Sequence, residues 1–472
     1  MICISVTPES RTLAPADLLN ASRQCDLIEL CLDHFLKEPN VAELIRSIEK
    51  PVLVSCRRPK DGGHWQGTEE QRITLLRSAI VAEPAYIELD LDIAPGIPRF
   101  GNTKRVIAYT SLNRPLSRID DVFEKCYQAK ADIVKVTWPT ENLDAAWPLL
   151  AAVTQKRELP VVGQGMGHSG ITFSLLGKRF QSPWIYAALE KGMEAFEHQP
   201  SINELKEDFS WDDIDSRTQF FGIVSGGRCD AVTARTLNAA FRSMDRNIRC
   251  LPIIPGDLKR LPRMLATLKI NALICDPLNP GGLNEMTTAS GEANSSSGYA
   301  DLLMQKGDRW TATSTIMDSI DRVGQQAGGS PDWTGRGSVL ICGHGSLAKH
   351  LAAEFLRRGA AVSLASPSDN AASAAAKSVG ARQASWASVY DLRIDTIAVA
   401  AEEVQCGSGR GQLNPGIIRE RMTMVDLSGY PGDSRFAEES RARGARLISG
   451  SDVFQMQMRL QFRKLTGRDL PV

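Results

Sequence analysis

Short apolar runs alternate with longer amphipathic stretches through the first 190 residues. Eight of the apolar runs have the length and composition of strands: Ile2–Val6, Leu27–Leu32, Pro51–Ser55, Tyr86–Leu91, Arg105–Thr110, Ile133–Trp138, Pro160–Gly163 and Trp184–Ala188. The stretches between them have helical periodicity, as in Val41–Lys50, Thr68–Glu83, Ser117–Ala129 and Leu143–Lys156. Strands alternating with helices indicate a parallel sheet. Eight such units predict a (β/α)8 TIM barrel, whose functional side chains lie at the carboxyl ends of the strands.

A polar stretch, Lys206–Asp215, follows the barrel. Its charges cannot line a core, so it predicts a linker. A new strand is expected at Phe220–Val224, and short strands and helices alternate from there to about Asp318. Within this region Thr288–Gly298 is rich in Ser, Gly and Ala and predicts a loop.

The strand Ser338–Cys342 runs directly into a G-x-G-x-x-A turn and then a helix, Lys349–Arg358. In this strand–turn–helix context Gly343, Gly345, Ser346 and Ala348 are candidates to hold the pyrophosphate of a dinucleotide. The next strand, Ala361–Ala365, ends in Ser-Pro-Ser-Asp, so it specifies neither NAD nor NADP. A Rossmann-like fold that binds no dinucleotide is therefore equally open.

Composition narrows the choice of partners. The 472 residues carry 55 basic and 55 acidic side chains, which favours a small-molecule substrate over nucleic acid. The ten cysteines have no C-x-x-C spacing and predict reduced residues in a cytoplasmic protein. No run approaches 18 apolar residues, and no motif predicts a metal site, so neither a membrane span nor a metal is expected. The oligomeric state is left open.

Lys135 is the strongest chemical signal in the chain. It lies within Ala131–Trp138, an otherwise apolar run of strand character. Burial lowers the pKa of an amine, which can then form a Schiff base with a ketone near neutral pH. A lysine that only pairs with a buried carboxylate is the alternative.

Several segments together resemble type I 3-dehydroquinate dehydratase across residues 1 to about 210: Ile28–Asp33, Pro51–Gly63, the Lys135 strand, Gly165–Gly167 and His198–Pro200. The second half resembles shikimate dehydrogenase through Phe221–Ile223, Asn238–Phe241, Ala293–Asn294, the glycine turn and the tail Gly450–Gly467. The order is that of the bifunctional shikimate-pathway enzymes of plants. The resemblance implies a TIM barrel followed by a shikimate-dehydrogenase-like α/β substrate domain and a Rossmann-like domain.

The resemblance assigns Lys135 as the lysine that forms an imine with the substrate ketone, while a histidine removes and returns protons. The histidine should end the fifth strand, but Ser111 stands there. His168, after the seventh strand, and His34, after the second, are candidate substitute bases at the same rim.

The resemblance also implies a set of substrate-binding residues: Glu29, Arg57, Asp61, Met166 and Gln199. Two arginines of the family are absent, because Cys31 and Ser174 occupy their positions. Since a charge-assisted contact to a carboxylate contributes roughly 2 kcal/mol, weaker substrate binding is expected.

The dehydrogenase half departs further from its family. Asn279 and Ser314 replace the Lys and Asp that move the proton, and Ala231 and Thr233 replace two serines that hold the substrate carboxylate. Asn294 and Gln457 are left as candidate ligand contacts, with NADP the cofactor implied by resemblance. Neither side chain titrates, so we predict no useful shikimate oxidation.

The expected boundaries are 1–213 for the barrel, 218–318 for the substrate-like domain, 319–450 for the Rossmann-like domain and 451–472 for a C-terminal helix that packs back on the substrate-like domain. The resemblance predicts a bifunctional protein of aromatic amino acid biosynthesis with weak or absent turnover in both halves. Two alternatives stay open: a non-catalytic descendant that binds a metabolite, dinucleotide or partner protein, and a different imine chemistry at Lys135.

Overall fold

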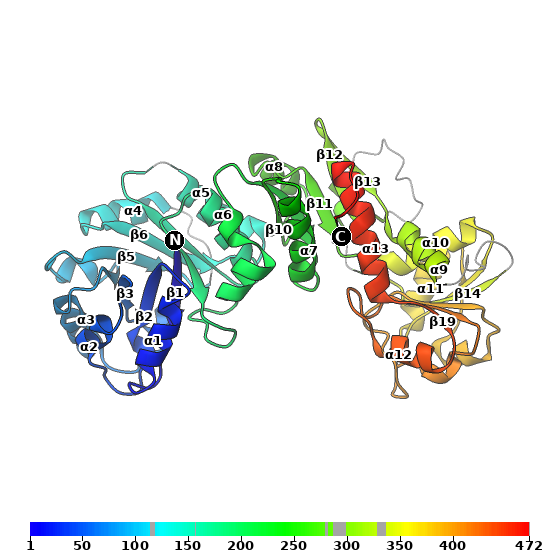
Figure 1. Ribbon diagram of the computed structural model, residues 1–472, viewed down its shortest axis with the longest axis horizontal. Coiled ribbons are helices and arrows are strands. Elements are labelled where there is room, and N and C mark those ends of the chain that lie inside the picture. Colours follow the sequence, from blue (N-terminus) through cyan, green and yellow to red (C-terminus); the bar gives the residue numbers. More distant parts are fainter. Residues whose placement is uncertain (114–118, 156, 279–281, 287–298, 328–336, 472) are drawn as a thin grey trace. The chain divides into compact units, whose positions relative to one another are not determined.

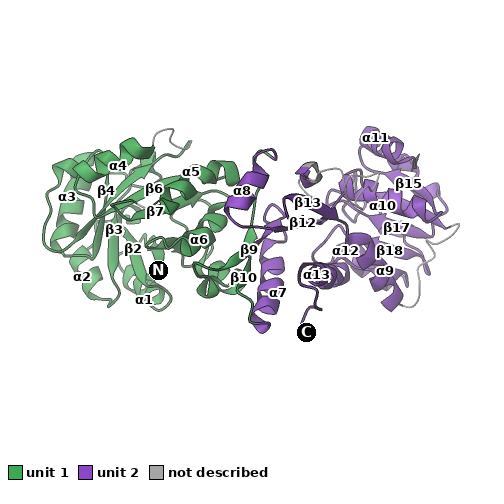
Figure 2. Ribbon diagram, turned by 90° about the horizontal axis from the view of Figure 1, so that it is seen from above, with its two compact units in different colours: residues 1–219, 245–257 green, residues 220–244, 258–472 purple. Residues whose placement is uncertain are grey.

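The computed structural model describes residues 1–113, 119–155, 157–278, 282–286, 299–327 and 337–471 (Figure 1). The predicted loop Thr288–Gly298, Asn279 and Asn294 lie outside these residues. The chain divides into two compact units, coloured separately in Figure 2. Unit 1 comprises residues 1–219 and 245–257, and unit 2 comprises residues 220–244 and 258–472. The four boundaries expected from the sequence stay predictions.

Unit 1 is an almost closed parallel barrel whose eight strands confirm the expected series. The strands are β1 (Ile2–Val6), β2 (Leu27–Cys31), β3 (Val52–Ser55), β4 (Tyr86–Asp90), β5 (Lys104–Thr110), β6 (Ile133–Pro139), β7 (Val161–Met166) and β8 (Ile185–Ala188). Their order is β7-β6-β5-β4-β3-β2-β1-β8, and neighbouring strands run parallel. The carboxyl ends of all eight strands therefore lie at one rim.

Helices cover the outside of this barrel (Figure 1). They are α1 (Ala14–Ser22), α2 (Val41–Arg46), α3 (Glu69–Val81), α4 (Ile119–Gln128), α5 (Leu143–Thr154) and α6 (Gly170–Arg179). Thr68 starts α3 with a capping box, in which its side chain accepts from the Gln71 amide and Gln71 accepts from the Thr68 amide. This satisfies two of the amides that a helix start leaves unpaired.

A buried apolar layer fills the barrel below the functional rim. It consists of Cys3, Leu27, Leu53, Val106, Ile133, Val162, Trp184 and Tyr186. Side chains alternate between the two faces of a strand. Lys135 follows Ile133 by two residues and Gln164 follows Val162 by two, so both also point into the barrel, one layer nearer the rim.

The prediction that Lys206–Asp215 is a linker is wrong. Residues Glu204–Asp208 form a π-helical turn and Trp211–Asp213 a 3₁₀ turn, and Phe209 and Trp211 are buried. The Lys178 ammonium donates to the Trp211 carbonyl at 2.8 Å and lies 3.6 Å from the centre of the Trp211 ring. Glu207, Asp212 and Asp213 are exposed, whereas Asp208, Phe209 and Trp211 are buried, so the stretch is part of unit 1.

Unit 2 contains two sheets. In one sheet, four strands are neighbours in the order β9 (Gln219–Val224), β11 (Ala272–Cys275), β12 (Leu302–Lys306) and β13 (Arg309–Thr313). The six-stranded sheet has the order β16-β15-β14-β17-β18-β19, with β14 (Ser338–Cys342), β15 (Ala361–Ala365), β16 (Arg382–Gln383), β17 (Thr396–Val399), β18 (Thr423–Asp426) and β19 (Arg446–Ile448). All its recorded pairs are parallel, as in a Rossmann-like fold.

The helices of unit 2 are α7 (Asp230–Ser243), α8 (Leu261–Thr267), α9 (Ile316–Gln326), α10 (Ser346–Arg357), α11 (Asp369–Val379), α12 (Arg435–Ala442) and α13 (Gly450–Thr466). The last helix, α13, contacts α9 and α7, and the Phe462 and Phe241 rings lie 5.4 Å apart. The strand β10 (Ile248–Pro252) belongs to residues 245–257, which are grouped with unit 1.

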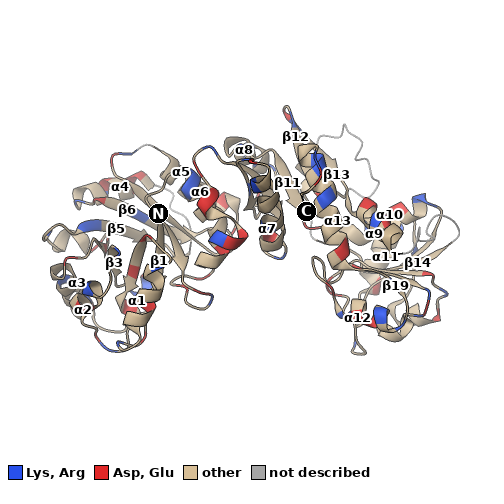
Figure 3. Ribbon diagram, in the orientation of Figure 1, with Lys and Arg blue, Asp and Glu red and all other residues tan. Residues whose placement is uncertain are grey.

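Acidic and basic residues are interspersed over the helices and loops of both units (Figure 3). In the described part of the chain, no helix has both the length and the hydropathy that a bilayer span requires. The same residues include no group of three or more His, Cys, Asp or Glu that could hold a metal ion.

Candidate functional site

Four buried charged side chains meet inside the barrel around Lys135. The Lys135 ammonium donates to Glu88 at 2.8 Å and lies 3.9 Å from Glu29. The Arg57 guanidinium donates to Glu88 at 2.8 Å through Nε and to Glu29 through Nη2. Two cations and two carboxylates balance, and none of the four side chains is more than a few per cent exposed. We call Glu29, Arg57, Glu88 and Lys135 the barrel cluster.

Burial and neighbouring charge set the protonation of the barrel cluster. Burial and the Arg57 charge lower the pKa of Lys135 from 10.5 to about 8, although Glu88 acts in the opposite direction. Burial alone would raise the pKa of Glu88, but Arg57 and Lys135 outweigh it and lower that pKa to about 2. Lys135 is therefore a lysine whose neutral amine is within reach at physiological pH, beside a carboxylate that stays ionised.

Two neutral side chains extend the cluster toward the loop after β8. The Ser5 hydroxyl donates to Glu29 at 2.6 Å, and the Gln199 amide donates to Ser5 at 3.1 Å. Gln199 accepts in turn from the Ala195 amide at 2.8 Å. This chain of hydrogen bonds joins the predicted residues Glu29 and Gln199 and orients the segment that carries them.

Aromatic and apolar side chains pack against the cluster. The Phe196 ring centre lies 4.9 Å from the Arg57 guanidinium carbon and 5.8 Å from the Lys135 ammonium, and the Tyr186 ring lies 4.4 Å from that ammonium. Cys31, Ala195 and Phe196 form a small apolar group with Met166 against it. Met166 thus lies near the cluster but contributes a thioether surface there, not a polar contact.

The structure leaves the predicted binding residue Asp61 outside the barrel cluster, and also Ser174, which stands at the position of a missing arginine. Asp61 lies beside Arg58, which also pairs with Asp90 and Asp92, so it belongs to a separate group of ion pairs. The Ser174 hydroxyl donates to the Gly170 carbonyl of its own helix at 3.1 Å. Ser174 therefore does not replace the missing arginine.

The candidate bases sit at the rim, as their strand positions require. Ser111 directly follows β5 and donates its amide to the Thr137 carbonyl at 2.9 Å. His168 is exposed, and its ring lies 4.2 Å from that of His198. The His34 ring lies 4.4 Å from that of His64, beside Asp33 and a cavity of 400 Å³. Neither histidine is joined to Lys135 by a recorded contact among the described residues.

Sequence reasoning missed Glu88, Ser5 and Phe196. Glu88 carries the same signal as Lys135, a single charge near the middle of an otherwise apolar strand, and its inward direction follows from its position two residues after Tyr86. Ser5 and Phe196 give no comparable signal, since a serine in a strand and a phenylalanine in a loop have many ordinary roles.

In unit 2 the glycine turn forms as predicted. Gly343 follows β14 with φ of +140°, and a Cβ there would lie 3.0 Å from the Ala401 Cβ and 3.2 Å from the Ala400 carbonyl, so only glycine fits. Gly345 is the residue before α10, Ser346 begins the helix, and Ala348 is fully buried against the sheet. The start of α10 has no side-chain cap, which suits the pyrophosphate of a dinucleotide.

The end of β15 gives no selectivity between the two dinucleotides. Ser366 is buried and donates to the Ser368 carbonyl at 2.9 Å. The Asp369 carboxylate accepts from the Trp386 amide at 2.9 Å and from the Ser385 hydroxyl at 3.3 Å. Asp369 thus caps a turn. The residues present fit the pyrophosphate of a dinucleotide, but none of them distinguishes the ribose hydroxyl of NAD from the 2′-phosphate of NADP.

A polar network joins strands and loops of unit 2. The Arg228 guanidinium donates to both oxygens of Asp276 at 2.6 and 2.8 Å, pairs with Glu402 at 2.6 Å and donates to the Tyr430 carbonyl. The Tyr430 hydroxyl donates to the Gln457 carbonyl oxygen at 2.8 Å. Gln457 is therefore buried with its acceptor engaged by protein, while its Nε2 has no partner among the described residues. The predicted contact Asn294 lies outside the described residues.

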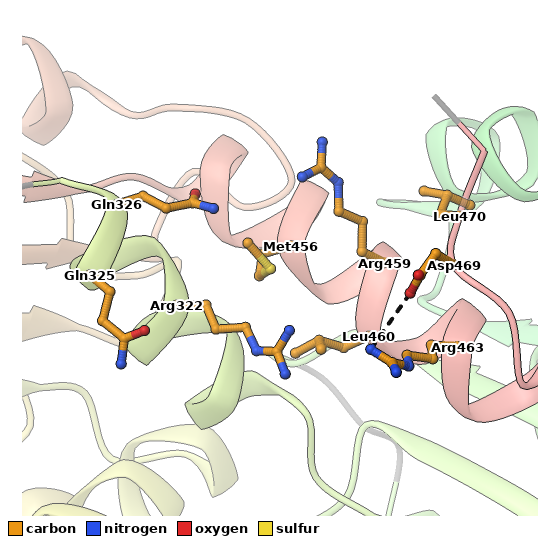
Figure 4. Close-up of a pocket in the computed structure, with 9 residues that line it drawn as sticks. All are labelled: Arg322, Gln325, Gln326, Met456, Arg459, Leu460, Arg463, Asp469 and Leu470. Atoms are coloured by element: carbon orange, nitrogen blue, oxygen red, sulfur yellow. Dashed lines mark ion pairs between the residues drawn. The ribbon is translucent and has the colours of Figure 1, made fainter.

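Unit 2 has a cavity of 770 Å³ between α9 and α13 (Figure 4). Arg322, Arg459 and Arg463 line it together with Met456 and Leu460, and Arg463 pairs with Asp469 at 3.6 Å. None of the residues predicted to bind a ligand lines this cavity.

Fold and site together define a (β/α)8 barrel with a buried amine at its centre, followed by a Rossmann-like unit. Residues 2–216 match the family Type I 3-dehydroquinase. A 3-dehydroquinate dehydratase of Methanothermobacter thermautotrophicus is 30% identical over 202 residues, spanning 40% of this chain and 88% of that protein. The chain belongs to the type I 3-dehydroquinase family.

Similarity also extends over both units. The chloroplastic bifunctional 3-dehydroquinate dehydratase/shikimate dehydrogenase of Arabidopsis thaliana is 24% identical over 475 residues, which span 94% of this chain and 78% of that protein. Among solved structures, dehydroquinate dehydratase and shikimate dehydrogenase from S. pombe covers 100% of this chain at 13% identity and a TM-score of 0.41. A shikimate dehydrogenase in complex with NADP+ covers 55% at 16% identity and a TM-score of 0.47.

The first prediction concerns the barrel cluster itself. Glu88→Gln leaves two buried cations with one carboxylate, so we expect the free energy of unfolding of unit 1 to fall by about 3 kcal/mol at pH 7. Because the pKa of Glu88 is lowered from 4.5 to about 2 in the folded protein, its contribution is complete above about pH 4.5 and disappears as the pH falls toward 2. Scanning calorimetry of the full chain between pH 3 and 7 measures both effects.

Glu70→Gln, an exposed glutamate on α3, is the matched control and should leave the transition unchanged. Equal unfolding temperatures of Glu88→Gln and the wild type at pH 7 would show that Glu88 does not stabilise the barrel cluster.

Proposed function

We propose that unit 1 dehydrates 3-dehydroquinate through an imine on Lys135. The observation that carries the proposal is the buried Lys135 amine, with its pKa lowered to about 8 and Glu88 at 2.8 Å. At pH 7 about a tenth of such an amine is neutral. The family membership of residues 2–216 supports the choice of substrate.

The amine of Lys135 attacks the ketone carbon, and the resulting carbinolamine loses water to give a protonated imine. The imine withdraws electrons and acidifies the adjacent C–H bond, so a base removes that proton to give an enamine. The neighbouring hydroxyl then takes up a proton and leaves as water, which restores the protonated imine in conjugation with the new double bond. Hydrolysis of the imine releases the conjugated product and returns the lysine. Ionised Glu88 stays beside the nitrogen and stabilises the positive charge of the protonated imine before proton removal and again after the hydroxyl has left.

Polar atoms that lack a protein partner support a substrate with several hydroxyl groups. Thr137 Oγ1 and Gln164 Oε1 are buried without a hydrogen-bond partner among the described residues. Thr137 follows Lys135 by two residues on β6, so its side chain leaves the same face of that strand. Buried polar atoms are nearly always paired, and ligand hydroxyls would pair these two.

Slow turnover is part of the proposal, because Ser111 stands where the family has its base. An unassisted serine hydroxyl has a pKa far above 7 and does not abstract a carbon-bound proton. In unit 2, we infer that the turn at Gly343 holds the pyrophosphate of a dinucleotide, which would supply a hydride acceptor there. Weak or absent turnover of shikimate by the dehydrogenase half stays a prediction.

The favoured test is imine trapping. Incubation with 3-dehydroquinate and borohydride should leave a reduced adduct on Lys135, located by mass spectrometry, and enone absorbance should report the product. Adduct formation should rise with pH up to about 8, because only the neutral amine attacks. Lys135→Met should abolish the adduct, whereas Lys125→Met, an exposed lysine on α4, should not. An adduct that persists in Lys135→Met would refute the assignment.

A gain of function tests the missing base. Ser111→His restores an imidazole at the end of β5, and we expect product formation to rise by about 100-fold, since a positioned general base contributes that much or more. If His168 is not a substitute base, adding His168→Gln to the wild type or to Ser111→His should leave the rate of product formation unchanged. No gain in Ser111→His, together with a loss in His168→Gln, would move the base role to His168.

A further inference from the structure

A histidine of unit 2 contacts the serine that replaces the family's aspartate. Ser314 directly follows β13, and its hydroxyl lies 2.9 Å from Nε2 of His350, on the second turn of α10. The two residues are 36 positions apart, so no local sequence pattern joins them. The His350 imidazole is therefore a titratable group beside Ser314, where the sequence alone predicted none.

The backbone at Ser314 is firmly held. The buried Asp301 carboxylate accepts from the amide and hydroxyl of Thr315 at 2.9 and 2.8 Å and from the Ile316 amide at 2.9 Å. The Gln461 amide donates to the Asp301 carbonyl at 3.2 Å, which ties this turn to α13. The residue next to Ser314 is therefore fixed from two sides, and Ser314 itself is only half-buried.

His350 is buried and held in a defined orientation. It is 3% exposed, and its ring stacks on that of Tyr299 at 4.4 Å with an interplanar angle of 15°. Burial lowers the pKa of His350 to about 4, while Glu354 raises it and Arg358 lowers it from the same helix. Arg358 is itself paired with Asp321 of α9 at 2.7 Å. At neutral pH the imidazole is uncharged and one ring nitrogen is an acceptor.

We propose that Ser314 and His350 form a proton relay for the oxidation of a hydroxyl-bearing ligand at the end of β13. The ligand hydroxyl gives its proton to Ser314 Oγ as the Ser314 proton moves to His350 Nε2. The C–H bond of the same carbon breaks with its electron pair, which an oxidised nicotinamide dinucleotide accepts, and a carbonyl group results. The imidazolium then returns its proton to solvent.

This relay goes beyond the dehydration proposed for unit 1 and would supply what the family's Lys and Asp pair supplies. A buried imidazole whose conjugate acid has a low pKa is a weak base, so the relay is expected to be slow.

The direction of donation is the first test. The relay requires that Ser314 donate to Nε2, so His350 must carry its proton on Nδ1. Long-range ¹H–¹⁵N spectra of the full chain at pH 7 distinguish the two tautomers, and His350→Gln assigns the signal among the six histidines. The Nδ1–H tautomer supports the proposal. The Nε2–H tautomer, in which the ring donates to Ser314, overturns it.

Turnover is the second test, with shikimate as the hydroxyl probe and NADP+ or NAD+ as the acceptor. Ser314→Ala and His350→Gln should each lower kcat by about 100-fold with little change in KM, and the double variant should lose no more than either one. Ser314→Thr keeps the hydroxyl and should retain most activity. The wild-type rate should fall as the pH drops toward about 4, where His350 becomes charged.

Ser243→Ala is the matched control, because Ser243 is an exposed serine on α7 that donates to the Ala240 carbonyl, and the variant should behave as the wild type. Full activity in Ser314→Ala, or no oxidation by the wild type, overturns the relay. Enone formation by unit 1 is measured on the same samples, so failure of the relay and failure of the dehydratase proposal are separately visible.

Discussion

The barrel depends on the mutual neutralisation of four buried charges. Glu29, Arg57, Glu88 and Lys135 come from β2, the loop after β3, β4 and β6, so one electrostatic contact set joins distant parts of the barrel wall. An isolated ion in this interior would cost several kcal/mol, whereas paired and hydrogen-bonded ions do not. Burial and the Arg57 charge lower the pKa of Lys135, whereas Glu88, which makes the buried ammonium tolerable, raises it. The pKa of about 8 is the balance of these opposing effects.

Much of unit 1 was predictable because its signals are local. The eight strands follow from short apolar runs, and Lys135 stood out as one charge within such a run. Glu88 gave the same signal in Tyr86–Asp90, but its partnership with Lys135 depends on how strands 47 residues apart meet across the barrel. The stretch Lys206–Asp215 was misread because its charges outnumber its aromatic residues, although Phe209 and Trp211 determine where it packs.

Unit 2 shows the opposite balance. Its glycine turn was recognisable from six residues, but its polar side chains are assembled from segments far apart in the chain. Gln457 is expected as a ligand contact, and its oxygen accepts from Tyr430, 27 residues away, which no local pattern predicts. His350 gave no signal at all, because a histidine on an amphipathic helix is common. Ser314 itself has no acid–base group at neutral pH, as its sequence position predicts, but the sequence did not show that His350 contacts it.

The assignment of residues 245–257 to unit 1 has a consequence for limited proteolysis. The chain leaves unit 1 after residue 219, returns for this short segment, and leaves again after residue 257. Within the segment, the Pro252 carbonyl accepts from Thr172 at 2.6 Å and the Ile254 carbonyl from the Leu143 amide at 2.9 Å. The two units are therefore interleaved along the chain, and a protease that cuts once between them cannot release both as whole fragments.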